Sequence, residues 1–190
     1  ARVTADPTVL VVRADAPWNT VEEFIQDAKN RPGELTYGSS GIYGSMHVPM
    51  AMLEKEADAE LLHIPYTGAG PAVLALMSGE VDALSSGPSS ILQQIKNGDF
   101  KALAHWGDKP IAALPEVKSL KDEGYDVQFV QWSGLFAPAK VDADIIETLR
   151  ASMARVAADD LTNQRIEAAG SPIEYMDADE FQVYWDADDI

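Results

Sequence analysis

Residues 37–47 read Tyr-Gly-Ser-Ser-Gly-Ile-Tyr-Gly-Ser-Met-His, and this stretch decides how the rest of the chain is interpreted. We expect a short strand before it, at residues 34–37, and the apolar spacing of residues 46–57 predicts a helix after it. The stretch holds three glycines and three serines, so its backbone can turn tightly and present bare N–H groups. Because the first turn of a helix has unpaired N–H groups and partial positive charge, a carboxylate is its natural guest. Taken alone, the loop is equally compatible with a tight turn whose serine caps the helix.

The same plan repeats twice further along the chain. Residues 61–66 and 80–84 each predict a strand, followed by small-residue loops at 67–71 and 85–90 and then by helices. Successive strand–loop–helix units predict an α/β fold with a mostly parallel sheet flanked by helices. Ligands of such sheets settle beyond the carboxyl ends of the strands. Three loops rich in small residues at the same edge of the sheet therefore favour a binding site there.

The remaining segments continue the alternation of strands and helices. Residues 8–13 form a continuous apolar run, typical of a strand buried on both faces. Thr20 and Glu23 have the spacing of a capping box. Residues 117–123 predict a short helix, and residues 127–138 an extended run with a Ser-Gly break, typical of a hinge between lobes or of a bulged strand. The last expected elements are helices at 142–158 and 161–169, a strand at 171–176 and a helix capped by Asp177.

Composition excludes several classes of partner. The formal net charge of −17 disfavours nucleic acid and anionic lipid. The chain has no cysteine, so it has no disulfide and no thiolate metal site. No apolar run approaches the roughly 20 residues that a membrane helix needs. The Asp-Ala-Asp pieces lack the glycine and the glutamate of a calcium loop.

The sequence predicts no catalytic apparatus. Residues 38–42 lack the closing glycine of a Gly-x-Ser-x-Gly elbow, and no histidine–carboxylate pair is indicated. His47, His63 and His105 fall on separate expected elements without i, i+4 spacing, which argues against a metal site. We therefore expect no enzyme, no cofactor and no metal.

Four motifs occur in one order along most of the chain. They are Tyr-Gly-Ser-Ser-Gly at 37–41, His-Ile-Pro-Tyr-Thr-Gly at 63–68, Gly-Glu-Val-Asp at 79–82 and Trp-Ser-Gly-Leu-Phe-Ala-Pro at 132–138. Together they resemble the periplasmic solute-binding receptors of tripartite tricarboxylate transporters. The resemblance implies a periplasmic-binding-protein-like (type II) clamshell. It also implies that a small organic carboxylate is captured in the periplasm and passed to the permease subunits of a membrane transporter.

The sequence departs from this family in two places. Family members begin with a further lobe-forming segment that carries a Pro-Gly-Gly type of loop, and nothing like it occurs here. We therefore expect a fragment with one complete lobe and part of the other. The expected division is an inter-lobe strand segment at 1–17, a central α/β lobe at 18–131, and a hinge crossing with the C-terminal part of the first lobe at 132–190. Ser85-Ser86-Gly87 stands where many relatives carry an aromatic-Asp-Asn/Ser sequence, which leaves the solute open.

The expected ligand site lies at the edge where the three loops meet. No arginine occurs between Arg31 and Arg150, so backbone N–H groups and hydroxyls must bind the carboxylate in place of an arginine clamp. The predicted ligand-binding residues are Ser39, Ser40, Gly41, Ser45, His47, Tyr66, Thr67, Gly68, Gly70, Ser85 and Ser86. The predicted function is capture of a di- or tricarboxylate, or a related organic acid, for such a transporter.

A second function stays open at this point. The ligand-sensing effector domain of a transcription regulator uses a similar clamshell. It would need a basic helix-turn-helix partner, which this acidic chain does not supply.

Overall fold

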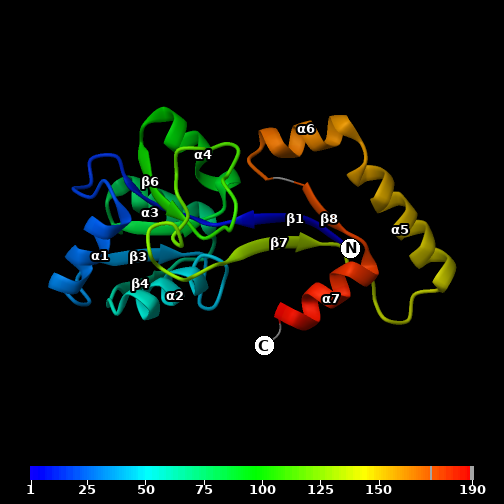
Figure 1. Ribbon diagram of the computed structural model, residues 1–190, viewed down its shortest axis with the longest axis horizontal. Helices are drawn as coiled ribbons and strands as arrows, with labels where there is room; N and C mark the ends of the chain where they lie inside the picture. Colours follow the sequence, from blue (N-terminus) through cyan, green and yellow to red (C-terminus); the bar gives the residue numbers. More distant parts are fainter. Residues whose placement is uncertain (172, 189–190) are drawn as a thin grey trace. The chain divides into compact units, whose positions relative to one another are not determined.

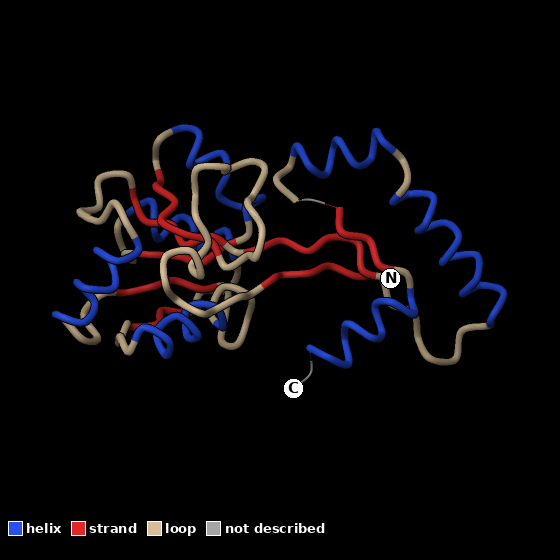
Figure 2. The backbone as a smooth tube through the Cα atoms, in the orientation of Figure 1, coloured by secondary structure: helices blue, strands red, loops and turns tan. Residues whose placement is uncertain are grey.

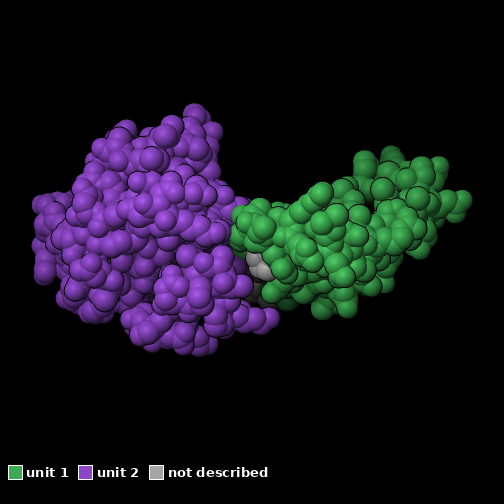
Figure 3. All heavy atoms as spheres, turned by 90° about the horizontal axis from the view of Figure 1, so that it is seen from above, with its two compact units in different colours: residues 1–6, 132–190 green, residues 7–131 purple. Residues whose placement is uncertain are grey.

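The computed structural model describes residues 1–171 and 173–188, which fall into two compact units. Figure 3 colours them: unit 1 comprises Ala1–Asp6 and the residues from Trp132 onward, and unit 2 comprises Pro7–Gln131. The chain passes from one unit to the other within two strands, β1 (Arg2–Pro7) and β7 (Val130–Gly134).

Unit 2 is built on a five-stranded sheet in the order β4-β3-β5-β2-β6. Its strands are β2 (Val9–Arg13), β3 (Thr36–Ser39), β4 (Leu62–Pro65), β5 (Ala83–Ser86) and β6 (Phe100–His105). β3 pairs in parallel with β4 and β5, whereas β2 runs antiparallel to both β5 and β6. The mostly parallel sheet is therefore confirmed, with β2 as the reversed strand.

Four helices cover this sheet (Figure 1). They are α1 (Val21–Asn30), α2 (Val48–Ala57), α3 (Ala69–Ser78) and α4 (Pro88–Asn97). The apolar side chains of α1 and α2 share one buried cluster with Leu10 and Val12, and those of α3 and α4 share another with Val9 and Val11. Alternate residues of β2 thus enter opposite clusters, which confirms the expectation of a strand buried on both faces.

The start of α1 follows the predicted capping pattern. The Glu23 N–H donates to Thr20 Oγ1 at 3.1 Å. The Glu23 carboxylate accepts the N–H of Asn19 (2.6 Å), one residue before the cap, instead of the Thr20 N–H of a standard capping box. The predicted cap is confirmed, and its reciprocal bond is shifted by one residue.

The helix predicted at residues 117–123 is wrong. The backbone there pairs with β6 instead: the His105 N–H donates to the Lys118 carbonyl (3.0 Å) and the Leu120 N–H to the His105 carbonyl (2.8 Å). Backbone groups used in this pairing cannot close helical turns. Only a turn follows, and Gly124 ends it with a φ of 95°.

Unit 1 combines a small sheet with three helices (Figures 1 and 2). The sheet has the order β7-β1-β8, with β8 (Ile173–Met176) antiparallel to β1. The helices are α5 (Ala143–Ala157), α6 (Asp160–Ala168) and α7 (Ala178–Asp188). The Asp177 carboxylate accepts the N–H groups of Asp179 and Glu180, both at 2.9 Å, which confirms the predicted cap. The strand expected at 171–176 includes residue 172, which lies outside the described residues.

The inter-lobe segment predicted at residues 1–17 and the extended run predicted at residues 127–138 are each less regular than expected. Residues 1–17 contain two strands that belong to different sheets, and only residues 130–134 of the predicted run 127–138 form a strand. The division into two lobes that close on a ligand stays a prediction. Over the described part of the chain, no helix is both long and apolar enough to cross a membrane.

Candidate functional site

The three predicted loops emerge at one edge of the sheet in unit 2. β4, β3 and β5 are neighbours and run in the same direction, so their carboxyl ends share that edge. β3 leads through residues 40–47 into α2, and β4 and β5 lead through short connections into α3 and α4. The long serine-glycine loop therefore lies between the other two.

The helices that begin at this edge lack side-chain caps. The N-cap residues His47, Gly68 and Gly87 of α2, α3 and α4 make no side-chain hydrogen bond to the first turn of the helix that follows. α1 starts at the opposite edge, because β2 is reversed, and it is capped by Thr20. The starts of α2, α3 and α4 therefore offer unpaired N–H groups to a ligand, but not a full first turn, because Pro49 and Pro88 have no N–H and the Val48 N–H bonds to the Gly44 carbonyl (3.0 Å).

The Ser39 hydroxyl is already engaged within the protein. Ser39 is the last residue of β3 and is fully buried. Its Oγ lies 2.6 Å from His63 Nε2, accepts the Gly41 N–H (3.2 Å) and donates to the Gly41 carbonyl (3.0 Å). The Ser39 hydroxyl and the Gly41 amide, both expected as ligand donors, therefore stabilise the turn that begins the loop. Ser40 and Ser45 are half-buried and lie further along the same loop.

The Tyr66 hydroxyl also has a partner. It donates to Glu80 Oε1 at 2.8 Å. Glu80 follows α3 and precedes β5, so it belongs to the opposite edge of the sheet. Burial raises the Tyr66 pKa, and the hydrogen bond to Glu80 adds to this shift. The exposed Thr67 and the half-buried Gly68 of this connection, and the exposed Gly70 in the first turn of α3, remain accessible.

The third predicted loop is much shorter than expected. Ser85 and Ser86 are the last residues of β5, paired with Leu10 and Val9 of β2, and both are buried. Only Gly87 separates the strand from α4. The prediction of a loop at 85–90 is wrong because pairing with β2 extends the strand. Among the described residues, none is bonded to the buried Ser85 Oγ.

An aromatic stack beneath the loop was missed at the sequence level. The rings of Tyr37, His47 and His63 are nearly parallel and form a cluster: the His63 centroid lies 4.9 Å from Tyr37 and 4.1 Å from His47, and the centroids of Tyr37 and His47 are 6.2 Å apart. Burial lowers the His63 pKa, and the nearby His47 lowers it further. The signal that could have found the stack is the parallel pairing of β3 with β4, which sets Tyr37 beside His63. His105 lies apart on β6 and accepts the Gly107 N–H.

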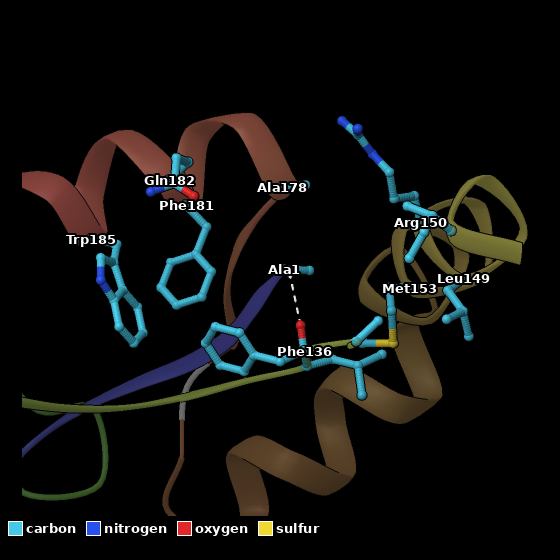
Figure 4. Close-up of a pocket in the computed structure, with 12 residues that line it drawn as sticks. Ala1, Phe136, Leu149, Arg150, Met153, Ala178, Phe181, Gln182 and Trp185 are labelled. Atoms are coloured by element: carbon cyan, nitrogen blue, oxygen red, sulfur yellow. Dashed lines mark hydrogen bonds between the residues drawn. The ribbon is translucent and has the colours of Figure 1, made fainter. Parts of the chain in front are cut away.

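Unit 1 contains an apolar cavity of about 310 Å³ (Figure 4). In the figure, Phe181 and Trp185 of α7 lie near Phe136, while α5 contributes residues that include Arg150. Arg150 forms ion pairs with Asp179 and Glu147. This lining is mostly apolar and its cation is already paired, so the cavity is poorly suited to a carboxylate. Within the described residues, no group of three His, Cys, Asp or Glu side chains could hold a metal ion.

Comparison with known proteins places these features in a family. The model of the "Tripartite tricarboxylate transporter family receptor" family matches residues 1–184. A Cupriavidus necator protein, described as "UPF0065 protein in gbd 5'region", is 33% identical over 174 residues, which are 90% of this chain and 52% of that protein. The chain thus spans about half the length of this relative.

Solved structures share the fold. "R. palustris Rpa4515 with adipate" matches 98% of this chain and 62% of its own, with a TM-score of 0.92 and 21% identity. "MatC (Rpa3494) from Rhodopseudomonas palustris with bound malate" matches 90% of this chain and 59% of its own, with a TM-score of 0.83 and 22% identity. The family match covers nearly the whole sequence, with the predicted motifs inside it. The chain belongs to the tripartite tricarboxylate transporter receptor family.

Proposed function

We propose that this chain is the solute-binding part of a periplasmic receptor that captures a small dicarboxylate, or a related organic acid, and delivers it to membrane permease subunits. The observation that carries the proposal is the convergence of three helix starts without side-chain caps at one edge of the sheet in unit 2. Partial positive charge and unpaired N–H groups at such helix starts favour a carboxylate.

The groups that remain accessible are sufficient for capture. The hydroxyls of Ser40, Ser45 and Thr67 and the N–H group of Gly68 lie on connections at this edge, and the N–H group of Gly70 lies in the first turn of α3. Hydrogen bonds to a charged group contribute roughly 1.5–3 kcal/mol each. Three or four of them would approach micromolar affinity, which corresponds to about −8 kcal/mol. The long-range field of a chain with net charge −17 opposes binding but is screened beyond about 8–10 Å at physiological salt.

The solved relatives support the class of ligand. The two proteins described above hold adipate and malate, and each of these molecules carries two carboxylates. Their fold matches most of this chain. A dicarboxylate of four to six carbons is therefore the substrate class that we assign, and a receptor of this kind releases its ligand chemically unchanged.

Calorimetric titration of the chain with malate and with adipate tests the proposal. We expect saturable binding of at least one acid and none of dimethyl adipate, which has the same carbon skeleton without charge. Ser40→Asp should abolish binding, because it places a negative charge where the carboxylate would sit. Asn97→Asp adds the same charge at the end of α4, at the opposite edge, and should bind as the unaltered chain does.

Two results would overturn the proposal. The first is the absence of acid binding up to millimolar concentration, and the second is a Ser40→Asp variant that binds as tightly as the unaltered chain. Proton NMR of the recovered acid should show no new product, and conversion of the acid would instead indicate an enzyme.

A further inference from the structure

His47 is the N-cap residue of α2, but its side chain has no capping role. It directly precedes α2 at the loop edge and is half-buried. Its side chain does not cap the helix, and its ring stacks instead on His63. The His47 ring is therefore held in place by stacking and not by a capping bond to α2.

One hydrogen bond determines which nitrogen of His47 carries the proton. The Tyr43 N–H donates to His47 Nδ1 at 2.9 Å. A ring nitrogen that accepts a hydrogen bond carries no proton, so neutral His47 carries its proton on Nε2. No described residue accepts a hydrogen bond from this Nε2–H. Tyr43 reaches His47 with a φ of 60° and is itself largely exposed.

A second set of bonds orients His63 beneath it. The Ser39 hydroxyl has a single proton, and the Gly41 carbonyl at 3.0 Å can only accept, so we place this proton on the bond to that carbonyl. We assign His63 Nε2, at 2.6 Å, as the donor to Ser39 Oγ, since this tautomer lets the hydroxyl satisfy both contacts with its one proton. This bond fixes the rotation of the His63 ring, and the parallel contact at 4.1 Å fixes the plane of His47 above it.

We infer that the Nε2–H of His47 donates a hydrogen bond to a carboxylate oxygen of the bound acid, and that Ser39 and His63 are positioning residues that orient this donor. The inference rests on the proposed function. It changes the role of Ser39 from a ligand donor to a residue that acts through His63 and His47. The His47 Nε2–H would then supply a side-chain hydrogen bond to the carboxylate in a segment that has no arginine.

Two substitutions of His47 separate its two nitrogens. The side-chain amide of asparagine reaches about as far as Nδ1, and that of glutamine about as far as Nε2. His47→Asn keeps an acceptor for the Tyr43 N–H and loses the outer donor, so we expect malate or adipate to bind about tenfold to a hundredfold more weakly. His47→Gln keeps a donor near Nε2 and should bind within about fivefold of the unaltered chain. The opposite ranking would show that His47 only anchors the loop and would overturn the inference.

Nitrogen-15 NMR of the imidazole rings tests the positioning residues. In the free chain we expect both His47 and His63 to be protonated at Nε2, and added acid should move the His47 Nε2–H resonance most. Ser39→Ala should give His63 a mixture of tautomers and weaken binding, while Ser39→Thr, which retains the hydroxyl, should restore both. Unchanged binding in Ser39→Ala would remove Ser39 and His63 from the positioning role.

Binding by the unaltered chain tests the proposed function, and binding by His47→Asn tests the role of His47. If the unaltered chain binds an acid and His47→Asn binds it equally well, the inference is wrong and the proposed function stands. If the unaltered chain binds no acid, the proposed function fails and the inference fails with it. Circular dichroism of each variant confirms that a loss of binding is not a loss of folding.

Discussion

Unit 2 and unit 1 differ in how much apolar surface they bury. Unit 2 contains two clusters of fully buried side chains, one on each face of its sheet. In unit 1 the buried hydrophobic residues among those described are Ala5 and Phe181, and neither α5 nor α6 has a buried residue. Removal of apolar surface from water is the main favourable contribution to folding. The stability of this chain is therefore concentrated in unit 2, which also carries the candidate site.

The difference shows what a rigid binding edge requires. The loops after β3 and β5 follow strands that are largely buried, so their starting points are fixed, whereas β4 is an edge strand without a buried residue. In unit 1 the amphipathic α5 leaves Ile145, Leu149 and Val156 exposed, and Trp185 of α7 is 40% exposed. Elements with few buried contacts open locally at low cost. We thus expect unit 2 to fold cooperatively and unit 1 to be the less stable of the two.

The largest effect should come from one substitution made in both units. Leu53 in α2 is fully buried, whereas Leu149 in α5 is 39% exposed. Leu53→Ala should lower the free energy of unfolding by about 2–5 kcal/mol, through lost burial and a cavity. Leu149→Ala should lower it by less than about 1 kcal/mol. Urea denaturation followed by circular dichroism measures both, and equal costs would abolish the distinction between the units.

A smaller effect is expected from adding a methyl group to a strand of each unit. A Cβ at Gly38 of β3 would lie 2.8 Å from Leu84 Cδ2, within a packed cluster. Gly38→Ala should therefore cost about 1–3 kcal/mol. A Cβ at Gly134 of β7 would meet the Ala1 carbonyl at 3.0 Å and the Phe181 ring at 3.1 Å. Contacts of 3.0–3.1 Å require a shift of only a few tenths of an ångström in a unit with few buried residues, so Gly134→Ala should cost less than about 1 kcal/mol in the same assay. A larger cost at Gly134 would show that unit 1 is packed as tightly as unit 2.

Asp6 offers a substitution that should stabilise unit 1. It is buried, its Oδ2 accepts a bond from Ser171 (3.1 Å), and no described group is bonded to its Oδ1. Burial raises the Asp6 pKa above 3.8, against hydrogen bonds from Ser171 and Thr4. The folded state thus binds the proton more tightly than the unfolded chain, and stability is lost as pH rises through the folded-state pKa. Asp6→Asn should raise the melting temperature at pH 7, and the gain should shrink towards pH 4. A gain that is independent of pH would contradict this account.

The opposite response to pH is expected in unit 2, with the smallest effect. Burial lowers the pKa of His63 and His105 below 6.5; His47 adds to the shift of His63, and Asp122 opposes that of His105. The unfolded chain takes up protons at higher pH than the folded one, so the free energy of unfolding falls as pH drops below 6.5. Amide exchange of β4 and β6 between pH 7.5 and 5.5, corrected for intrinsic rates, measures this. His105→Asn, which keeps an acceptor for Gly107, should reduce the slope, and an unchanged slope would exclude His105 as its source.

Local features of the fold could be predicted because they depend on neighbouring residues. Thr20 and Asp177 cap their helices as expected, since a capping side chain bonds to N–H groups within three residues of itself. The helix expected at 117–123 failed because long-range pairing with β6 uses the same backbone groups.

The sequence by itself determined the alternation of strands and helices and the small-residue character of the connections at 40–47 and 66–68, because periodicity, caps and glycines act over a few residues. Only the tertiary structure decided which polar groups remain accessible there. The engagement of Ser39 by His63, the burial of Ser85 and Ser86 against β2, and the stacking of His47 on His63 all join residues that are distant in sequence. Such contacts depend on strand order and on the reversed direction of β2, which no local pattern encodes.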